Sequence, residues 1–331
     1  PVLQQVEHFN NPGVTANDAF KPVTRYFDRI TRPEQIIQSF PAAIQTMLDP
    51  ADCGPACISL SQDIQGQTFD YPEEFFKEKI HAIRRPRPDE FQIKEAAEKI
   101  KSSKNPIIIS GGGVFYSDAM EDLSNFAIKH NIPVTQTVMG YSTMKRDHSH
   151  FAGQIGALGG KNTNSLAKQT DLAIAVGTKL GDFTTGSWAN FENENFKLVS
   201  INVSRFDANK HLAQAVVGDA KVSLNDLSQA LGDWKSGEEW NKKSQVELKV
   251  WNEQVDKESA PTNQEVPSYV QVIGAVYRNS DPTDIAVTAA GGLVGEVVQV
   301  WRPRELNTHE TEWGFSCMSY EISGALGIKM A

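Results

Sequence analysis

Cysteine is scarce in this chain, and its scarcity excludes a disulfide framework. The sequence has three cysteines, and Cys53 and Cys57 have three residues between them, so the pair matches neither the redox nor the zinc C-x-x-C spacing. We therefore expect free thiols that are buried as small apolar side chains.

Long apolar runs are lacking as well. No stretch approaches the roughly 20 apolar residues that span a bilayer. The first twenty residues have neither the basic start nor the apolar segment of a signal peptide. The sequence therefore predicts no membrane partner and favours a cytoplasmic location.

Positive charge is in deficit. The chain has 32 Lys and Arg against 41 Asp and Glu, a formal net charge of −9, whereas nucleic-acid-binding proteins cluster basic side chains against phosphates. The one dense basic run, at 84–87, is interrupted by Pro86 and is typical of a solvated linker. We expect no nucleic acid partner. The 331 residues suffice for two or three globular domains.

A buried strand that ends in glycines stands at the centre of the chain. Residues 107–110 are Ile-Ile-Ile-Ser, followed by Gly111, Gly112 and Gly113. Such a run is typical of a parallel strand whose turn leads into a helix. Helical spacing precedes it, and Ser117 and Asp118 are candidate caps of a second helix that ends at about residue 130. This order is half of a doubly wound α/β domain.

The same glycines match part of the dinucleotide-binding fingerprint. Gly111 and Gly113 fit the first two positions of G-x-G-x-x-G, in which backbone amides hold a pyrophosphate. Tyr116 stands in place of the third glycine, and no acidic residue follows the next strand, at 133–137, to hold a ribose. The sequence therefore favours a tight strand-to-helix turn without a ligand over NAD binding.

The first segment, residues 1–85, is too small for a domain of its own. Residues 1–32 are expected to be irregular, a helix follows to about Met47, and one buried strand is expected at 56–60. A sheet of one strand is not viable. Either its partner strands come from elsewhere, or this segment is the end of a larger domain.

The rest of the chain is predicted to be of the α/β class. Residues 86–235 alternate helices and strands and are expected to form a complete parallel sheet. Strands are expected at 107–110, 133–137, 172–176 and 198–203, with a glycine-rich loop at 153–160. Residues 236–265 are interpreted as a polar, helix-compatible linker across the domains. Residues 266–331 open a third unit, in which a strand at 285–287 leads into a glycine turn.

Several stretches together resemble the thiamine diphosphate enzyme superfamily related to acetolactate synthase. They are Pro1–Glu7, Lys21–Val23, Asp28–Gln35, Gly177–Phe183, Ile201–Ser204 and Glu312–Glu321. The resemblance covers essentially the whole chain, and the runs 28–35 and 314–321 are the specific ones. Within the superfamily, the closest resemblance is to members that open the ring of a cyclic 1,2-diketone by hydrolysis during inositol degradation.

The resemblance implies an architecture of three α/β domains, one for the aminopyrimidine of the cofactor, one central, and one for the diphosphate. This chain would hold the last part of the first domain, all of the central Rossmann-like domain and the opening of the third. It would therefore be an internal fragment with incomplete outer domains, which accounts for the single strand expected at 56–60.

The resemblance also assigns residues to thiamine diphosphate. Met318 would be the large apolar side chain that holds the cofactor bent, with core packing as the alternative. The carbonyl of Ser316, beside Cys317, would accept a hydrogen bond from the exocyclic amine. A turn before a helix would offer backbone amides to the diphosphate, and it consists of Ala289, Ala290, Gly291 and Gly292.

Other parts of such a site are expected outside this chain. In the family, the glutamate that polarises the aminopyrimidine lies upstream of these residues, and the Gly-Asp-Gly and Asn ligands of Mg²⁺ lie downstream. No Gly-Asp-Gly occurs here, and we predict no metal ligand within the chain. Ser319 stands where the family usually has glycine, which bears on the local backbone.

Histidines offer a few further candidates. His309 lies close in sequence to the cofactor-binding run and is a candidate for substrate binding or proton transfer. His148 with His150, and His309 with Glu310 and Glu312, have the residue types of metal clusters. For the first pair a third ligand is not evident, so a polar loop is the better interpretation.

The implied activity is thiamine-diphosphate-dependent hydrolysis of a carbon–carbon bond in a cyclic dione. One alternative is an acetolactate-synthase-like carboligase with a flavin lined by Gly111–Gly113 and Gly177–Lys179. An alternative of another class is a catalytically silent scaffold unit. Because the superfamily builds its cofactor site between subunits, the resemblance implies a homodimer or tetramer for the full protein, and inactivity and weak assembly for this chain alone.

Overall fold

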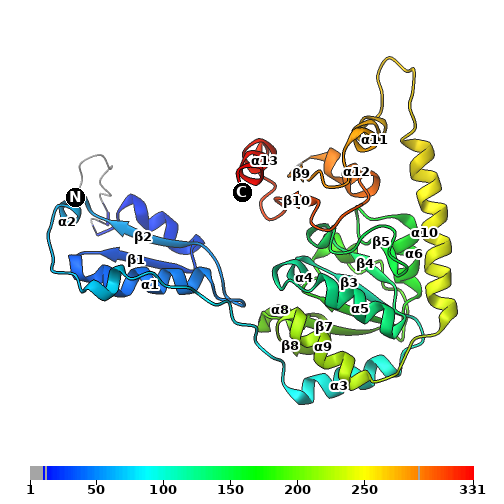
Figure 1. The fold of residues 1–331 in the computed structure, drawn as a ribbon, viewed down its shortest axis with the longest axis horizontal. Helices are drawn as coiled ribbons and strands as arrows, with labels where there is room; N and C mark the ends of the chain where they lie inside the picture. Colours follow the sequence, from blue (N-terminus) through cyan, green and yellow to red (C-terminus); the bar gives the residue numbers. More distant parts are fainter. Residues whose placement is uncertain (1–9, 12, 290) are drawn as a thin grey trace. The chain divides into compact units, whose positions relative to one another are not determined.

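The computed structural model describes residues 10–11, 13–289 and 291–331. The chain divides into two compact units, residues 1–84 and 85–331 (Figure 1). The finer domain limits expected from the sequence stay predictions. No helix among the described residues combines the length and the apolar character that crossing a membrane requires.

The first unit is built on two parallel strands, β1 (Tyr26–Ile30) and β2 (Ala56–Leu60). The prediction of β2 is confirmed, whereas the expectation that residues 1–32 are irregular is wrong at β1. The other elements of the first unit are helical: η1 (Ala16–Val23), η2 (Pro33–Gln35), α1 (Ile36–Met47), α2 (Gln62–Gln65) and η3 (Glu73–Phe76).

Strand β1 escaped prediction because charged residues occupy its middle. The carboxylate of Asp28 accepts hydrogen bonds from the side chains of Ser39, on α1, and Gln35, and the bond from Ser39 is the main cause of its lowered pKa. The guanidinium of Arg29 lies 2.7 Å from the carboxylate of Asp18. Partners distant in sequence thus satisfy the charges that would otherwise oppose a half-buried strand.

The second unit contains a six-stranded parallel sheet in the order β5-β4-β3-β6-β7-β8 (Figure 1). The prediction of an α/β fold with a complete central sheet is confirmed. The strands are β3 (Pro106–Ser110), β4 (Val134–Gln136), β5 (Phe151–Gln154), β6 (Leu172–Val176), β7 (Lys197–Asn202) and β8 (Gln214–Val217). The order reverses between β3 and β6, which is the topological switch point of a doubly wound sheet.

Helices cover both faces of this sheet. On one face α3 (Glu90–Lys101), α5 (Met120–His130) and α9 (Ala220–Leu231) bury Ile108, and on the other α6 (Lys161–Gln169) and α10 (Glu238–Glu258) bury Ile107 and Ile109. Because successive strand residues point to opposite faces, the consecutive isoleucines fill both cores. Shorter helices are α4 (Gly112–Tyr116), η4 (Val138–Gly140), α7 (Asp182–Thr185), α8 (Arg205–Ala208) and η5 (Lys210–Leu212).

Strand β5 and the start of α5 differ from expectation. The glycine-rich loop was predicted at 153–160, but its first residue, Gly153, lies in β5 and has φ +104°. A glycine is needed there because helix α6 packs closely against it: an added methyl group would lie 2.9 Å from Oγ1 of Thr163. Ser117 and Asp118 do not cap α5, whose N-cap is Ala119 without a side-chain bond. Ser117 instead accepts the N–H of Ala220.

Residues 236–265, expected as a linker, contain the long helix α10. Its buried Leu248 belongs to one core cluster of the central sheet, and Trp240 to the other. The indole N–H of Trp240 donates to the carbonyl of Pro106 at 2.8 Å. This helix also supplies Val255 to the core of the C-terminal part.

The C-terminal part pairs two short parallel strands. They are β9 (Ala286–Thr288) and β10 (His309–Thr311), accompanied by α11 (Tyr269–Asn279), α12 (Gly292–Val300) and α13 (Tyr320–Met330). Buried side chains of α11 and α12 form its core with Trp301. Helix α13 has no buried residue.

The three cysteines are free, as expected, but none is fully buried. Cys53 and Cys317 are exposed, and Cys57 is half-buried. The expectation of burial is wrong because Cys53 and Cys317 lie in loops, at 49–55 and 312–319.

The glycines at the switch point are accounted for by loop packing. The N–H of Gly113 donates to the carbonyl of Gly177 at 2.9 Å, and Gly177 has φ +60°. A methyl group added at Gly113 would lie 2.6 Å from Cα of Gly177. The turns after β3 and β6 therefore touch backbone to backbone, which favours the tight turn expected at Gly111–Gly113.

This contact predicts a strong effect of Gly113→Ala. Because the added methyl meets backbone, we expect a loss of about 1–3 kcal/mol in the free energy of unfolding, measured by denaturant titration. The control is Gly327→Ala in α13, where an added methyl meets nothing within 4 Å and stability should be unchanged or slightly higher. Equal stability of the two variants would contradict the packing argument.

Candidate functional site

The two C-terminal strands bring the predicted cofactor-binding segments to one edge. Strands β9 and β10 are parallel, with Thr288 opposite Thr311, so the segments that follow them leave the sheet at the same edge. The N–H of Glu312 donates to the carbonyl of Thr288 at 3.1 Å and extends this pairing. The glycine turn after Thr288 and the loop at 312–319 therefore begin side by side.

The turn after β9 exposes its backbone. Gly291, at φ +94°, is the N-cap of α12, and Gly292 is its first residue. A methyl added at either glycine would meet nothing within 4 Å, and no side chain caps the helix. The first-turn amides of α12 are thus open to an anion. Ala289 is buried, and Ala290 lies outside the described residues.

A carboxylate shapes the loop after β10. The side chain of Glu312 accepts the backbone N–H groups of Phe315 at 2.8 Å and Cys317 at 2.6 Å. Both bonds lower the pKa of Glu312, and the bond from Phe315 has the larger effect. Sequence reasoning treated Glu312 only as a possible metal ligand and missed this role.

The loop presents Met318 to solvent. Its side chain is 84% exposed, so core packing, the alternative considered for Met318, is not what the structure has. Ser316 has φ +51° and Ser319 has φ +75°. The left-handed backbone at 319 is the conformation that favours glycine, and the chain adopts it here with serine.

His309 lies at the beginning of β10, whereas the loop with Met318 leaves the strand at its end. Its Nε2 lies 3.3 Å from Oγ1 of Thr288, and its ring meets that of Tyr141 edge-on with centroids 4.9 Å apart. Burial lowers the pKa of His309 to about 4, so the imidazole is neutral at pH 7. Its role in catalysis stays a prediction.

Tyr141 links the C-terminal part to the central domain through hydrogen bonds of its hydroxyl. Its buried hydroxyl lies 3.0 Å from the carbonyl of Val298 and also contacts that of Trp301. Both carbonyls lie at the end of α12, where helix carbonyls lack intrahelical partners. Burial raises the pKa of Tyr141, so the hydroxyl keeps its proton.

His148 and His150, the other candidate pair, bond to neighbouring polar groups. His148 Nε2 lies 2.8 Å from the hydroxyl of Ser124, and His150 Nε2 lies 3.1 Å from Oδ1 of Asn131. Within residues 10–11, 13–289 and 291–331, no group of three or more His, Cys, Asp or Glu side chains is placed to hold a metal ion.

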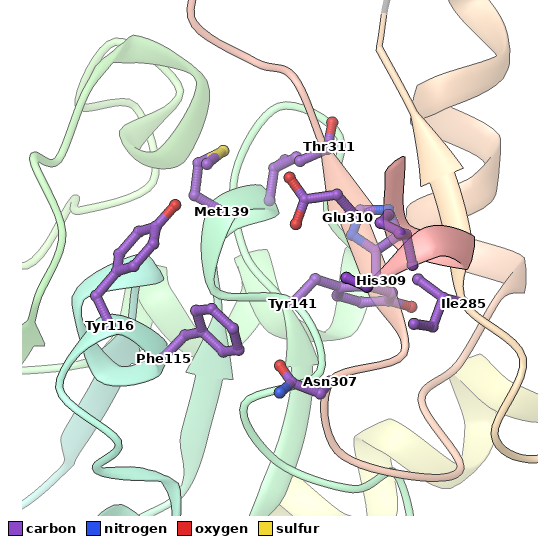
Figure 2. A pocket seen from close by; sticks show the side chains of 12 residues that line it. Phe115, Tyr116, Met139, Tyr141, Ile285, Asn307, His309, Glu310 and Thr311 are labelled. Atoms are coloured by element: carbon purple, nitrogen blue, oxygen red, sulfur yellow. The ribbon is translucent and has the colours of Figure 1, made fainter. Parts of the chain in front are cut away.

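The second unit also contains a cavity of about 420 Å³ that sequence reasoning missed (Figure 2). It is lined by Phe115, Tyr116, Val138, Met139, Tyr141, Ile285, Asn307, His309, Glu310, Thr311, Ile328 and Ala331. These residues come from segments up to about 215 positions apart, so no local pattern indicates the cavity.

Burial of neutral His309 predicts a pH-dependent stability. Its folded pKa of about 4 lies below the ordinary 6.5, so its contribution is complete above pH 6.5 and is lost as the pH falls from 6.5 toward 4. The loss is at most about 3 kcal/mol. Denaturant titrations over this range should show a flatter pH dependence for His309→Gln than for the wild type.

The control for this prediction is His81→Gln, which changes an exposed histidine of the first unit. Its pH dependence between pH 6.5 and 4 should match that of the wild type. A wild-type slope in His309→Gln would show that His309 does not resist protonation in the folded chain.

Comparison with known proteins finds similarity along the whole chain. Residues 93–227 match the model of the thiamine pyrophosphate enzyme central domain, and this range contains all six strands of the central sheet. Proteins named 3D-(3,5/4)-trihydroxycyclohexane-1,2-dione hydrolase align along the whole chain. That of Bacillus licheniformis is 40% identical over 355 residues, which are 100% of this chain and 56% of the relative.

Two further relatives of the same name agree. The Clostridium tetani protein is 40% identical over 357 residues, 100% of this chain and 55% of its own length. The Shouchella clausii protein is 38% identical over 355 residues, 100% of this chain and 56% of its own length. The chain thus spans 55–56% of the length of these three relatives, and its residues 93–227 are similar to the central domain of thiamine pyrophosphate enzymes.

Proposed function

We propose that this chain forms part of a thiamine-diphosphate-dependent hydrolase that opens the ring of a trihydroxycyclohexane-1,2-dione in inositol catabolism. The observation that carries the proposal is the 38–40% identity, along the entire chain, to relatives that bear this hydrolase name. Water would cleave the bond between the two carbonyl carbons, so that one carbon becomes a carboxylic acid and the other an aldehyde of the same opened molecule.

The residues at the edge of β9 and β10 fit the cofactor. The open amides at Gly292 and Leu293 would hold the diphosphate, because they lie at an uncapped helix N-terminus that no side chain covers. When bound, thiamine diphosphate supplies an electron sink for the carbanion that bond cleavage leaves. The exposed side chain of Met318 would support the cofactor from the neighbouring loop.

The loop residues would act by positioning. Glu312, through its bonds to the N–H groups of Phe315 and Cys317, holds the loop in the shape that presents the carbonyl of Ser316 and the side chain of Met318. His309, neutral and half-buried, is proposed to bind substrate or to move a proton. The ligands of Mg²⁺ are proposed to lie outside these 331 residues.

The alternative functions have less support. A flavin-bearing carboligase would place its flavin by Gly111–Gly113 and Gly177–Lys179, yet Gly113 and Gly177 pack directly against each other. The names of the relatives favour neither this enzyme nor a silent scaffold. A cytoplasmic location and a homodimeric or tetrameric assembly are part of the proposal.

The activity can be tested directly. The full-length protein, incubated with trihydroxycyclohexane-1,2-dione, thiamine diphosphate and Mg²⁺, should consume the dione and yield one product heavier by one water, with a carboxylate and an aldehyde. Omission of thiamine diphosphate should abolish turnover. Acetolactate formation from pyruvate, together with a flavin absorption band and an unchanged dione, would favour the carboligase instead.

Leu293 offers a sharper test of the diphosphate site. It is 45% exposed at the second position of α12. A carboxylate there suits the helix dipole but repels a diphosphate. We expect Leu293→Glu to weaken binding of thiamine diphosphate at least about tenfold, which corresponds to about 1.4 kcal/mol, without lowering the melting temperature.

The matched control is Leu293→Gln, which has the same size without the charge and should bind thiamine diphosphate more tightly than Leu293→Glu. Titration calorimetry on the full-length protein measures both variants. Thiamine, which lacks the diphosphate, should bind the two equally. Equal affinity of both variants for thiamine diphosphate would show that the diphosphate does not bind at this turn.

A further inference from the structure

The cavity between α4 and β10 has the size and walls of a ligand site. Its volume of about 420 Å³ falls within the range of about 300–1,000 Å³ that is typical of small-molecule pockets. Phe115 and Tyr116, whose ring centroids are 5.4 Å apart, come from α4. Met139 and Tyr141 come from the segment around η4. Figure 2 shows Phe115, Tyr116 and Met139 on one side of the cavity and the β10 side chains on the other, where Tyr141 lies next to His309.

The polar groups of the cavity favour positive charge. Glu310 is half-buried. Among the described residues its carboxylate forms no salt bridge and accepts one hydrogen bond, from the hydroxyl of Tyr320 at 3.5 Å. No Lys or Arg is among the lining residues. Figure 2 shows the Glu310 carboxylate extending from β10 toward Met139. A partly buried carboxylate without a cation is costly, and a bound cation would offset that cost.

Two neighbours on β10 add polar groups to the cavity but no positive charge. The hydroxyl of Thr311, a residue only 6% exposed, is buried and has no hydrogen-bond partner within the part of the chain that the structure describes. The imidazole of His309 is neutral, because burial lowers its pKa to about 4, and so it adds no positive charge. Anions and phosphates would meet the Glu310 carboxylate without compensation.

We propose that this cavity binds a small organic cation, an amine or a quaternary ammonium with an apolar body, whose charge pairs with Glu310. The apolar body would lie against Phe115 and Met139, and aromatic faces attract such cations in addition to the carboxylate. The site consists of residues of the second unit and includes His309, to which the proposed function assigns a role. The charge pairing at Glu310 does not rest on that function.

Three probes of similar size test the charge preference. Benzylamine is protonated at pH 7, benzyl alcohol is its neutral counterpart, and benzoate is an anion. In titration calorimetry with the full-length protein, benzylamine should bind at least about tenfold more tightly than benzyl alcohol, and benzoate should not bind. Equal binding of the amine and the alcohol, or no binding of benzylamine at millimolar concentration, would overturn the proposal.

Variants locate the site. Glu310→Gln keeps the size of the side chain but removes its charge, and it should weaken benzylamine at least about tenfold while leaving benzyl alcohol unchanged. Phe115→Leu should weaken both probes. The control Glu121→Gln removes an exposed carboxylate from α5 and should bind like the wild type. Wild-type affinity of benzylamine for Glu310→Gln would contradict the site, and melting temperatures verify that each variant is folded.

Discussion

The fold of the second unit depends on the close contact between two turns, those after β3 and β6, at the switch point of its central sheet. The hydrogen bond from Gly113 to Gly177 uses an amide that a dinucleotide fingerprint would direct at a phosphate. Side chains at either position would separate the turns after β3 and β6. The contact between the two turns thus accounts for the glycines that resemble a nucleotide-binding fingerprint. We infer that the central sheet is a scaffold, and that cofactor chemistry belongs to the shorter pair β9 and β10.

That shorter pair is held in place by groups distant in sequence. The hydroxyl of Tyr141 contacts the carbonyls at the end of α12, and the start of the same helix carries the open glycine turn. Helix α10 packs on the central sheet and also supplies Val255 to the C-terminal core. A short sheet of two strands is marginal alone. Its attachment to the larger domain explains how it positions the turn at Gly291 and the loop at Met318.

The sequence predicted those elements whose burial is visible in a local pattern of apolar residues. Residues 107–110 form a strand buried on both faces, so consecutive isoleucines sufficed to find it. Strand β1 was missed because Asp28 and Arg29 find partners that local pattern does not reveal. The cofactor-binding assignment of Met318 came from resemblance, since an exposed methionine carries no signal of its own. The cavity at Glu310 was beyond prediction because it joins α4 to segments about 170–215 positions away.

A crystal structure of the full-length protein soaked with thiamine diphosphate and Mg²⁺ tests the central claim most directly. The account predicts diphosphate density against the amides of Gly292 and Leu293, with the side chain of Met318 beneath the bent cofactor. Cofactor density at Gly111–Gly113, or a diphosphate remote from the start of α12, would contradict it.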